Sequence, residues 1–165
     1  MTDRHVPDLA DPTRGPTAAQ AAGLTLAAAR AAVAAALAEA RRLGVAMSCA
    51  VIDAGDELVC FERMDGADLV SVRLARDKAW TALVNRMPTG ALAPLVQPGS
   101  EFYGYDSVAG GRMIVFAGGM PLERGGVLVG AVGVSGGDTE QDQRAADAAV
   151  RAFAGNAPPE DQPTG

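Results

Sequence analysis

Histidine is almost missing from this 165-residue sequence, which has only His5, close to its start. The scarcity bears on residues 133–137, Gly-Val-Ser-Gly-Gly, which match the G-x-S-x-G turn that exposes a nucleophilic serine in α/β-hydrolases. Such a serine needs a histidine base, which follows it in the chain of that fold. No histidine follows Ser135, so the sequence predicts that these glycines form a sharp strand-to-helix turn instead of a hydrolase site.

Cysteine is nearly as rare, with Cys49 and Cys60 as the only two. Two cysteines without histidine partners are too few for a disulfide framework or a zinc site, so we expect buried free thiols. Asp138, Glu140 and Asp142 form an acidic group that suits a hard cation, but a solvated acidic helix start is the commoner arrangement. We therefore predict no metal site.

Positive charge is also in short supply, because 14 lysines and arginines face 20 aspartates and glutamates, for a net charge of −6. This balance argues against nucleic acid or an anionic membrane as a partner. No apolar run approaches the ~20 residues that cross a bilayer. Residues 1–17 also lack the apolar core of a signal peptide, so we expect a cytoplasmic protein.

The composition divides the chain into three parts. Residues 1–22 contain prolines and no hydrophobic periodicity, which predicts a flexible tail. Residues 155–165 have the composition of a second, disordered tail. Residues 23–154 remain as a single domain, long enough to bury a core made mainly of alanine, glycine and valine.

Helix and turn signals are clear at four places. A helix is predicted from the N-cap Thr25 to a stop at Gly44, and residues 45–64 read as a β-hairpin that turns at residues 53–56. A second helix covers residues 67–84. The last helix begins at Asp138, with Gln141 three residues later in a capping-box pattern.

The remaining segments predict a loop and three strands. Residues 87–111 form a long loop with one short helix at its start, and loops of this length are often functional. The runs 112–119, 120–126 and 127–136 indicate antiparallel strands joined by glycine turns. The expected fold is therefore α+β, with helices packed on a five-stranded antiparallel sheet.

Lys78 is the most informative charged residue. It lies beside the apolar stripe of the 67–84 helix, where partial loss of hydration lowers a lysine pKa and suits it to base chemistry or anion binding. The alternative is that its stem packs and its ammonium group reaches water. Nearby, Arg73 and Asp77 are expected to form an ordinary surface ion pair.

Several other side chains suit a ligand pocket. Arg63, at the end of the hairpin, can orient a carboxylate through its planar guanidinium group. Aromatic rings in the loop offer flat apolar walls, and glycines near residue 118 allow close backbone approach. The predicted ligand-binding residues are Arg63, Phe102, Tyr103, Tyr105, Gly118 and Gly119.

Four short motifs carry a family resemblance in the same order: RMDGA, ARDKAWTA, GGMPLERGG and GVSGGDTEQD. With these motifs, residues 24–154 resemble the GlcG/HbpS-like haem-binding-protein family, which includes the C-terminal domain of a corrinoid adenosyltransferase of propanediol metabolism. The resemblance implies a three-layer α/β/α domain around a five-stranded antiparallel sheet. It also implies assembly as a homodimer or a higher homo-oligomer.

Two functions remain open from the sequence. The first is a small-molecule-binding domain for haem, a corrinoid or a related cyclic or carboxylated metabolite. Haem in particular would lack an axial histidine within the domain, and Tyr103, Tyr105 or a methionine would have to replace it. The second is a cofactor-independent isomerase, lyase or cyclase, in which Lys78 and either Glu140 or Asp142 move protons under the 97–105 loop.

Overall fold

Local capping chemistry places the ends of the first helix. In the computed structural model, which describes residues 23–156, helix α2 spans Leu26–Leu43. The Thr25 hydroxyl accepts a hydrogen bond from the Ala28 N–H at 3.1 Å, and Gly44 ends the helix with a left-handed φ of 71°. Both ends agree with the sequence prediction. The predicted tails, residues 1–22 and most of 155–165, lie outside the described residues.

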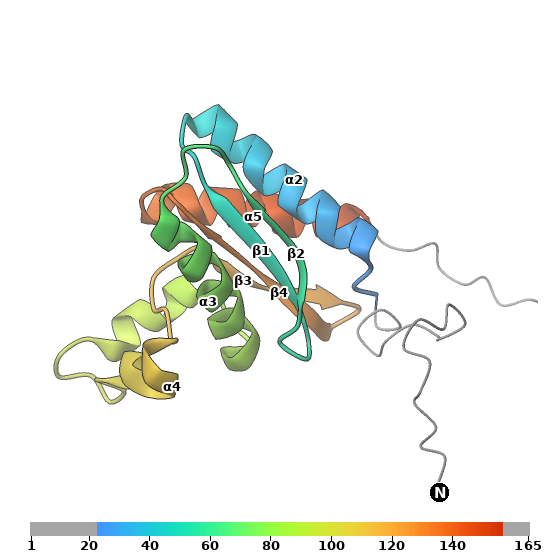
Figure 1. The fold of residues 1–165 in the computed structure, drawn as a ribbon. Coiled ribbons are helices and arrows are strands. Elements are labelled where there is room, and N and C mark those ends of the chain that lie inside the picture. Colours follow the sequence, from blue (N-terminus) through green and yellow to red (C-terminus); the bar gives the residue numbers. More distant parts are fainter. Residues whose placement is uncertain (1–22, 157–165) are drawn as a thin grey trace, which may run out of the picture.

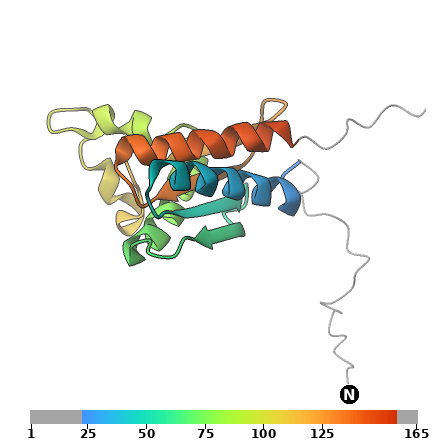
Figure 2. The same ribbon diagram turned by 90° about the horizontal axis from the view of Figure 1, so that it is seen from above.

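The last helix, α5 (Thr139–Gly155), begins at the predicted capping box. The Asp138 carboxylate accepts from the Gln141 N–H at 2.8 Å, and the Gln141 side chain accepts from the Asp138 N–H at 3.0 Å. In Figures 1 and 2, α2 and α5 lie side by side on one face of the sheet. Among residues 23–156, no helix combines the length and the hydrophobicity that a membrane span requires.

The sheet is antiparallel, with strand order β2-β1-β4-β3. Its strands are β1 (Ser48–Asp53), β2 (Leu58–Arg63), β3 (Gly119–Arg124) and β4 (Val127–Ser135). The predicted hairpin is confirmed: Asp53 Oδ1 accepts from the N–H groups of Gly55 and Glu57, which closes the turn between β1 and β2. The central pair, β1 and β4, runs in register from Ser48 opposite Ser135 to Asp53 opposite Gly130.

The prediction of five strands is wrong, because residues 112–118 do not form one in the described chain. Side-chain hydroxyls satisfy part of this segment's backbone: Thr81 accepts from the Ile114 N–H at 3.0 Å, and Thr89 donates to the Phe116 carbonyl at 2.8 Å. The segment therefore does not pair as a strand, and it meets the sheet at its last residue, where the Gly118 carbonyl accepts from the Val134 N–H at 2.8 Å. A short apolar run does not distinguish a strand from another buried segment.

The other face of the sheet carries α3 (Leu69–Asn85), which completes three layers (Figures 1 and 2). Helix and sheet approach very closely at Gly133 in β4. A Cβ atom there would lie 2.0 Å from the Ala75 carbonyl oxygen and 2.5 Å from the Ala79 nitrogen. Only glycine allows this backbone-to-backbone contact, which seats the middle of α3 on the sheet.

The segment between α3 and β3 is a long loop, as predicted, but it contains three short helical segments instead of the one predicted at its start. These are η1 (Thr89–Val96), η2 (Tyr105–Ser107) and α4 (Val108–Gly111). The start of the loop is held to β3, because the Thr89 hydroxyl accepts from the Gly119 N–H at 2.9 Å. This contact places Thr89 beside the middle of α3, because Gly119 itself lies against the Lys78 carbonyl oxygen.

Candidate functional site

Lys78 and Asp142 form a closed ion pair inside the protein. The Lys78 ammonium lies 2.5 Å from Asp142 Oδ2 and donates to the Val134 carbonyl at 3.0 Å. It also lies 4.7 Å from the centre of the Phe116 ring. The Lys78 side chain is 0% exposed and that of Asp142 3%. The pair thus connects α3 to α5 across the end of β4, and the Lys78 ammonium does not reach water.

Burial dominates the electrostatics of this pair. It lowers the pKa of Lys78 and raises that of Asp142, and the attraction between the two charges opposes both shifts. The Gly137 N–H also donates to Asp142 at 2.9 Å. Glu140, the other acidic partner considered from the sequence, is exposed on the first turn of α5. The fold therefore brings Lys78 together with Asp142.

Gly118 and Gly119 lie against this pair. A Cβ at Gly118 would be 2.9 Å from Lys78 Nζ and 2.6 Å from the Val134 carbonyl oxygen. At Gly119, a Cβ would lie 2.4 Å from the Lys78 carbonyl oxygen and 2.5 Å from Thr89 Cγ2. The space beside both glycines is already filled by the protein's own atoms.

An apolar groove opens where α3 ends and the 97–105 loop folds back. The Tyr105 hydroxyl donates to Asn85 Oδ1 at 2.8 Å, and this bond ties the loop to the helix. The Phe102 ring lies edge-on to Tyr105, with 6.3 Å between their centres. The groove has a volume of about 260 Å³ and is lined by Asn85, Met87, Leu92, Leu95, Val96, Phe102 and Tyr105.

The remaining predicted ligand-binding residues are scattered. Tyr103 is 67% exposed and does not line the groove, although its neighbour Phe102 does. Arg63 lies in a separate hollow of about 360 Å³, between the end of β2 and helix α2. Of the predicted ligand-binding side chains, only Phe102 and Tyr105 share one groove.

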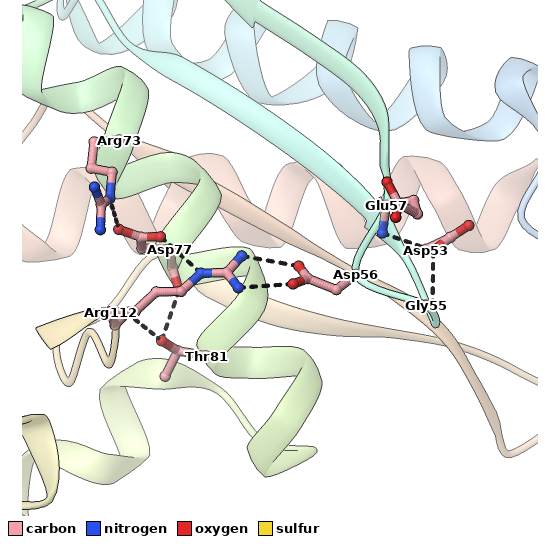
Figure 3. Close-up of polar contacts among 8 residues, drawn as sticks. All are labelled: Asp53, Gly55, Asp56, Glu57, Arg73, Asp77, Thr81 and Arg112. Carbon is pink, nitrogen blue, oxygen red and sulfur yellow. Dashed lines mark hydrogen bonds and ion pairs between the residues drawn. The ribbon is translucent and has the colours of Figure 1, made fainter. Parts of the chain in front are cut away.

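Arg112 forms a second polar cluster, which the sequence analysis did not predict (Figure 3). Its Nη1 and Nη2 atoms donate to the two carboxylate oxygens of Asp56, at 2.8 and 3.0 Å, and its Nε donates to Asp77 at 3.2 Å. The guanidinium group also stacks 4.5 Å from the centre of the Trp80 ring. These hydrogen bonds to Asp56 and Asp77 raise the pKa of Arg112.

Asp77 is the centre of this cluster. Arg73 donates to its other carboxylate oxygen, which confirms the predicted ion pair, but Asp77 itself is only 6% exposed. Beside it lies a hollow of about 390 Å³, lined by Leu69, Val72, Arg73, Arg76, Asp77 and Arg112. The pairing of Asp56 with Arg112 spans 56 positions, so no local sequence signal could have indicated it.

Among residues 23–156, no group of three or more histidine, cysteine, aspartate or glutamate side chains is arranged to hold a metal ion. Both cysteines are free thiols, Cys49 buried and Cys60 half-buried.

Comparison with known proteins identifies the family. The family model described as "Haem degrading protein HbpS-like" matches residues 24–151. The corrinoid adenosyltransferase PduO of Salmonella typhimurium is 43% identical over 120 residues, or 72% of this chain. The match spans only 35% of that relative's own length.

Two solved structures share the fold. Klebsiella pneumoniae protein ORFY has a TM-score of 0.79 and 35% identity, covering 86% of this chain and 95% of that one. A structure described as a PduOC:haem complex has a TM-score of 0.76 and 38% identity, covering 79% of this chain and 94% of that one. These matches confirm the resemblance of the sequence motifs, and the chain belongs to the HbpS-like family.

Proposed function

We propose that this protein binds haem in the groove between the end of α3 and the 97–105 loop. The observation that carries the proposal is the groove's lining. Leu92 and Val96 are buried in its wall, whereas Leu95 is 41% and Phe102 51% exposed. Large apolar side chains that stay exposed around a groove favour a flat apolar ligand. The haem complex of a relative that is 38% identical supports the same ligand.

The groove also contains side chains that can hold iron. Met87 contributes a thioether and Tyr105 a phenol, both of which serve as axial haem ligands in proteins. The Tyr105 hydroxyl is engaged with Asn85, whereas no hydrogen bond to the Met87 sulfur is found among residues 23–156. Met87 is therefore the proposed axial ligand, and Tyr105 positions the loop. Bound haem would supply iron redox chemistry, and the chain's apolar wall would exclude water from one edge of the ring.

The volume of the groove sets how much of the ring it can enclose. At about 260 Å³ it is smaller than the roughly 300–1,000 Å³ of pockets that surround a drug-sized ligand. The groove would thus enclose one edge of the haem, and another protein surface would have to cover the rest of the ring. A second copy of this chain is the proposed source of that surface, in line with the homo-oligomer predicted from the sequence.

No separate observation favours a corrinoid as the ligand. None favours the alternative function, a cofactor-independent enzyme that uses Lys78 for proton transfer. Lys78 and Asp142 are buried against each other, and neither lines the groove or the two hollows described above. A proton-transfer pair needs contact with its substrate. Glu140 is exposed on the first turn of α5, whereas the Lys78 side chain is 0% exposed and is paired with Asp142.

A haem titration of the full chain tests the proposal. We expect a stoichiometric Soret shift and a methionine-ligated spectrum in the wild type. Met87→Leu should keep the apolar wall, lose that spectrum and bind more weakly, whereas Tyr105→Phe should keep it. Met120→Leu, a methionine on β3 outside the groove, is the matched control. A wild-type protein with no saturable Soret shift would contradict haem binding. A Met87→Leu spectrum like that of the control would contradict only the choice of ligand.

The oligomeric state is a separate proposal, which light scattering after size-exclusion chromatography would check. Val70 is 60% exposed in α3 and Val127 56% exposed in β4, and exposed apolar side chains of this size favour a partner surface. We expect at least a dimer at micromolar concentration. A monomer of 16.7 kDa would contradict the proposal.

A further inference from the structure

The hollow at the start of α3 has an unusual charge for this chain. Three of its six lining side chains are arginines, Arg73, Arg76 and Arg112, and Asp77 is the one acidic side chain in the lining. The whole chain nevertheless has a net charge of −6. We infer that this hollow is a binding site for the carboxylate group of an organic acid, distinct from the apolar groove.

The negative charge of Asp77 does not repel an anion from the hollow, because both of its carboxylate oxygens are paired with arginines. One of its carboxylate oxygens accepts from Arg73 and the other from Arg112 (Figure 3). Each of the three guanidinium nitrogens of Arg112 already donates to a carboxylate, because Nη1 and Nη2 hold both oxygens of Asp56. Arg112 therefore fixes and neutralises Asp77, and it is a positioning residue rather than the group that binds the ligand.

The donors that remain belong to Arg73 and Arg76. In the described structure, Arg73 makes one side-chain contact, from Nε to Asp77, which leaves both terminal nitrogens for a ligand. Its side chain is 70% exposed. Arg76 has no hydrogen bond or ion pair to any of residues 23–156 and lines the same hollow. Two guanidinium groups with unused donors match the two oxygens of a carboxylate.

The apolar part of the lining selects the kind of acid. Leu69 is 80% exposed and Val72 is half-buried, and both face the hollow beside the arginines. Apolar side chains next to guanidinium groups favour a carboxylate attached to an apolar body over a bare inorganic anion. Such a group has two sources, a free organic acid or a propionate of a bound haem, and the two arms of the experiment distinguish them.

The first arm uses benzoate as the probe and neutral benzamide, of the same shape, as its control. Chemical shifts of the ¹⁵N-labelled full chain, without haem, should move with benzoate at residues 69–77 and 112, and should not move with benzamide. Arg76→Gln should weaken benzoate binding about tenfold, the loss expected for a charge-assisted hydrogen bond. Arg151→Gln is the matched control, because it removes the same charge from the exposed face of α5.

The second arm measures haem affinity in the same variants. If Arg76→Gln weakens haem about tenfold more than Arg151→Gln does, the carboxylate is a haem propionate. If only benzoate binding is weakened, the ligand is a free acid. The inference is overturned if benzoate binds no better than benzamide and Arg76→Gln leaves haem affinity at the control value. Benzoate binding in a chain that takes no haem would overturn the proposed function and leave this inference standing.

Discussion

Asp77 and Lys78 are consecutive residues of α3, yet they belong to opposite kinds of polar site. Lys78 points toward the end of the sheet, where it and Asp142 are 0% and 3% exposed. Asp77 points toward the hollow, where its partner Arg112 is 30% exposed and Arg73 70%. One helix thus carries a closed ion pair on one side and an open arginine cluster on the other.

The difference between the two sites shows what burial does to a charged pair. In the closed site Lys78 donates to Val134 and Asp142, and Gly118 and Gly119 leave no space beside the pair, so we expect the pair to stabilise the fold. In the open site Arg73 and Arg76 keep unused donors next to water. A ligand can compete for those donors at little cost to the fold.

The largest expected effect comes from breaking the closed pair. If the Lys78 ammonium reached water, Lys78→Met would remove a charge and spare the fold. The pair is buried instead, so the substitution leaves the Asp142 carboxylate inside the protein without its partner. We expect a loss of about 3–5 kcal/mol in the free energy of unfolding, measured by chemical denaturation. The double variant Lys78→Met/Asp142→Leu should recover most of it. A single variant within about 0.5 kcal/mol of wild type would show that the pair is not closed.

Alkaline pH tests the same pair with a smaller expected effect. Burial lowers the folded-state pKa of Lys78 below its ordinary value of 10.5. Between the folded pKa and 10.5, the unfolded chain binds more protons, so this group makes the free energy of unfolding rise with pH. Denaturation of wild type and the double variant across that window should show the rise in wild type alone. A difference that shrinks with pH would reverse the assigned direction.

Gly119→Ala tests whether close backbone packing helps to close the Lys78–Asp142 site. The added Cβ would lie 2.4 Å from the Lys78 carbonyl oxygen, against backbone that has no room to move. We expect a loss of about 1–3 kcal/mol, as for other overpacked sites. Gly155→Ala is the matched control, because nothing lies within 4 Å of its Cβ and, as at Gly119, its φ is not positive. Equal losses in the two variants would mean that the close contact at Gly119 is not what matters.

The smallest effect is expected in the open cluster. Arg112→Gln removes the paired hydrogen bonds to Asp56, but Arg73 still holds Asp77 and water can reach the site. A loss of about 1 kcal/mol in the free energy of unfolding is expected. High salt should shrink the difference from wild type. A loss as large as that of Lys78→Met would mean that this cluster is structural too.

The sequence by itself determined the elements whose signals are local. Thr25, Gly44 and the Asp138–Gln141 box mark helix ends because a cap bonds to backbone only a few residues away. The turn after β1 was predictable for the same reason, since Asp53 closes it on its own neighbours. The family motifs were also readable directly from the chain.

Only the tertiary structure decided what distant segments do to one another. The sequence of residues 112–118 predicts a strand, but in the structure the hydroxyls of Thr81 and Thr89 bond to the backbone of this segment. Lys78 forms a closed pair because the fold brings Asp142, 64 positions away in the sequence, next to it. Arg112 likewise pairs with Asp56 across 56 positions. Periodicity records that a side chain faces the interior, but not which groups it will find there. The groove beside Tyr105 exists for the same reason, because a loop must fold back on α3 to form it.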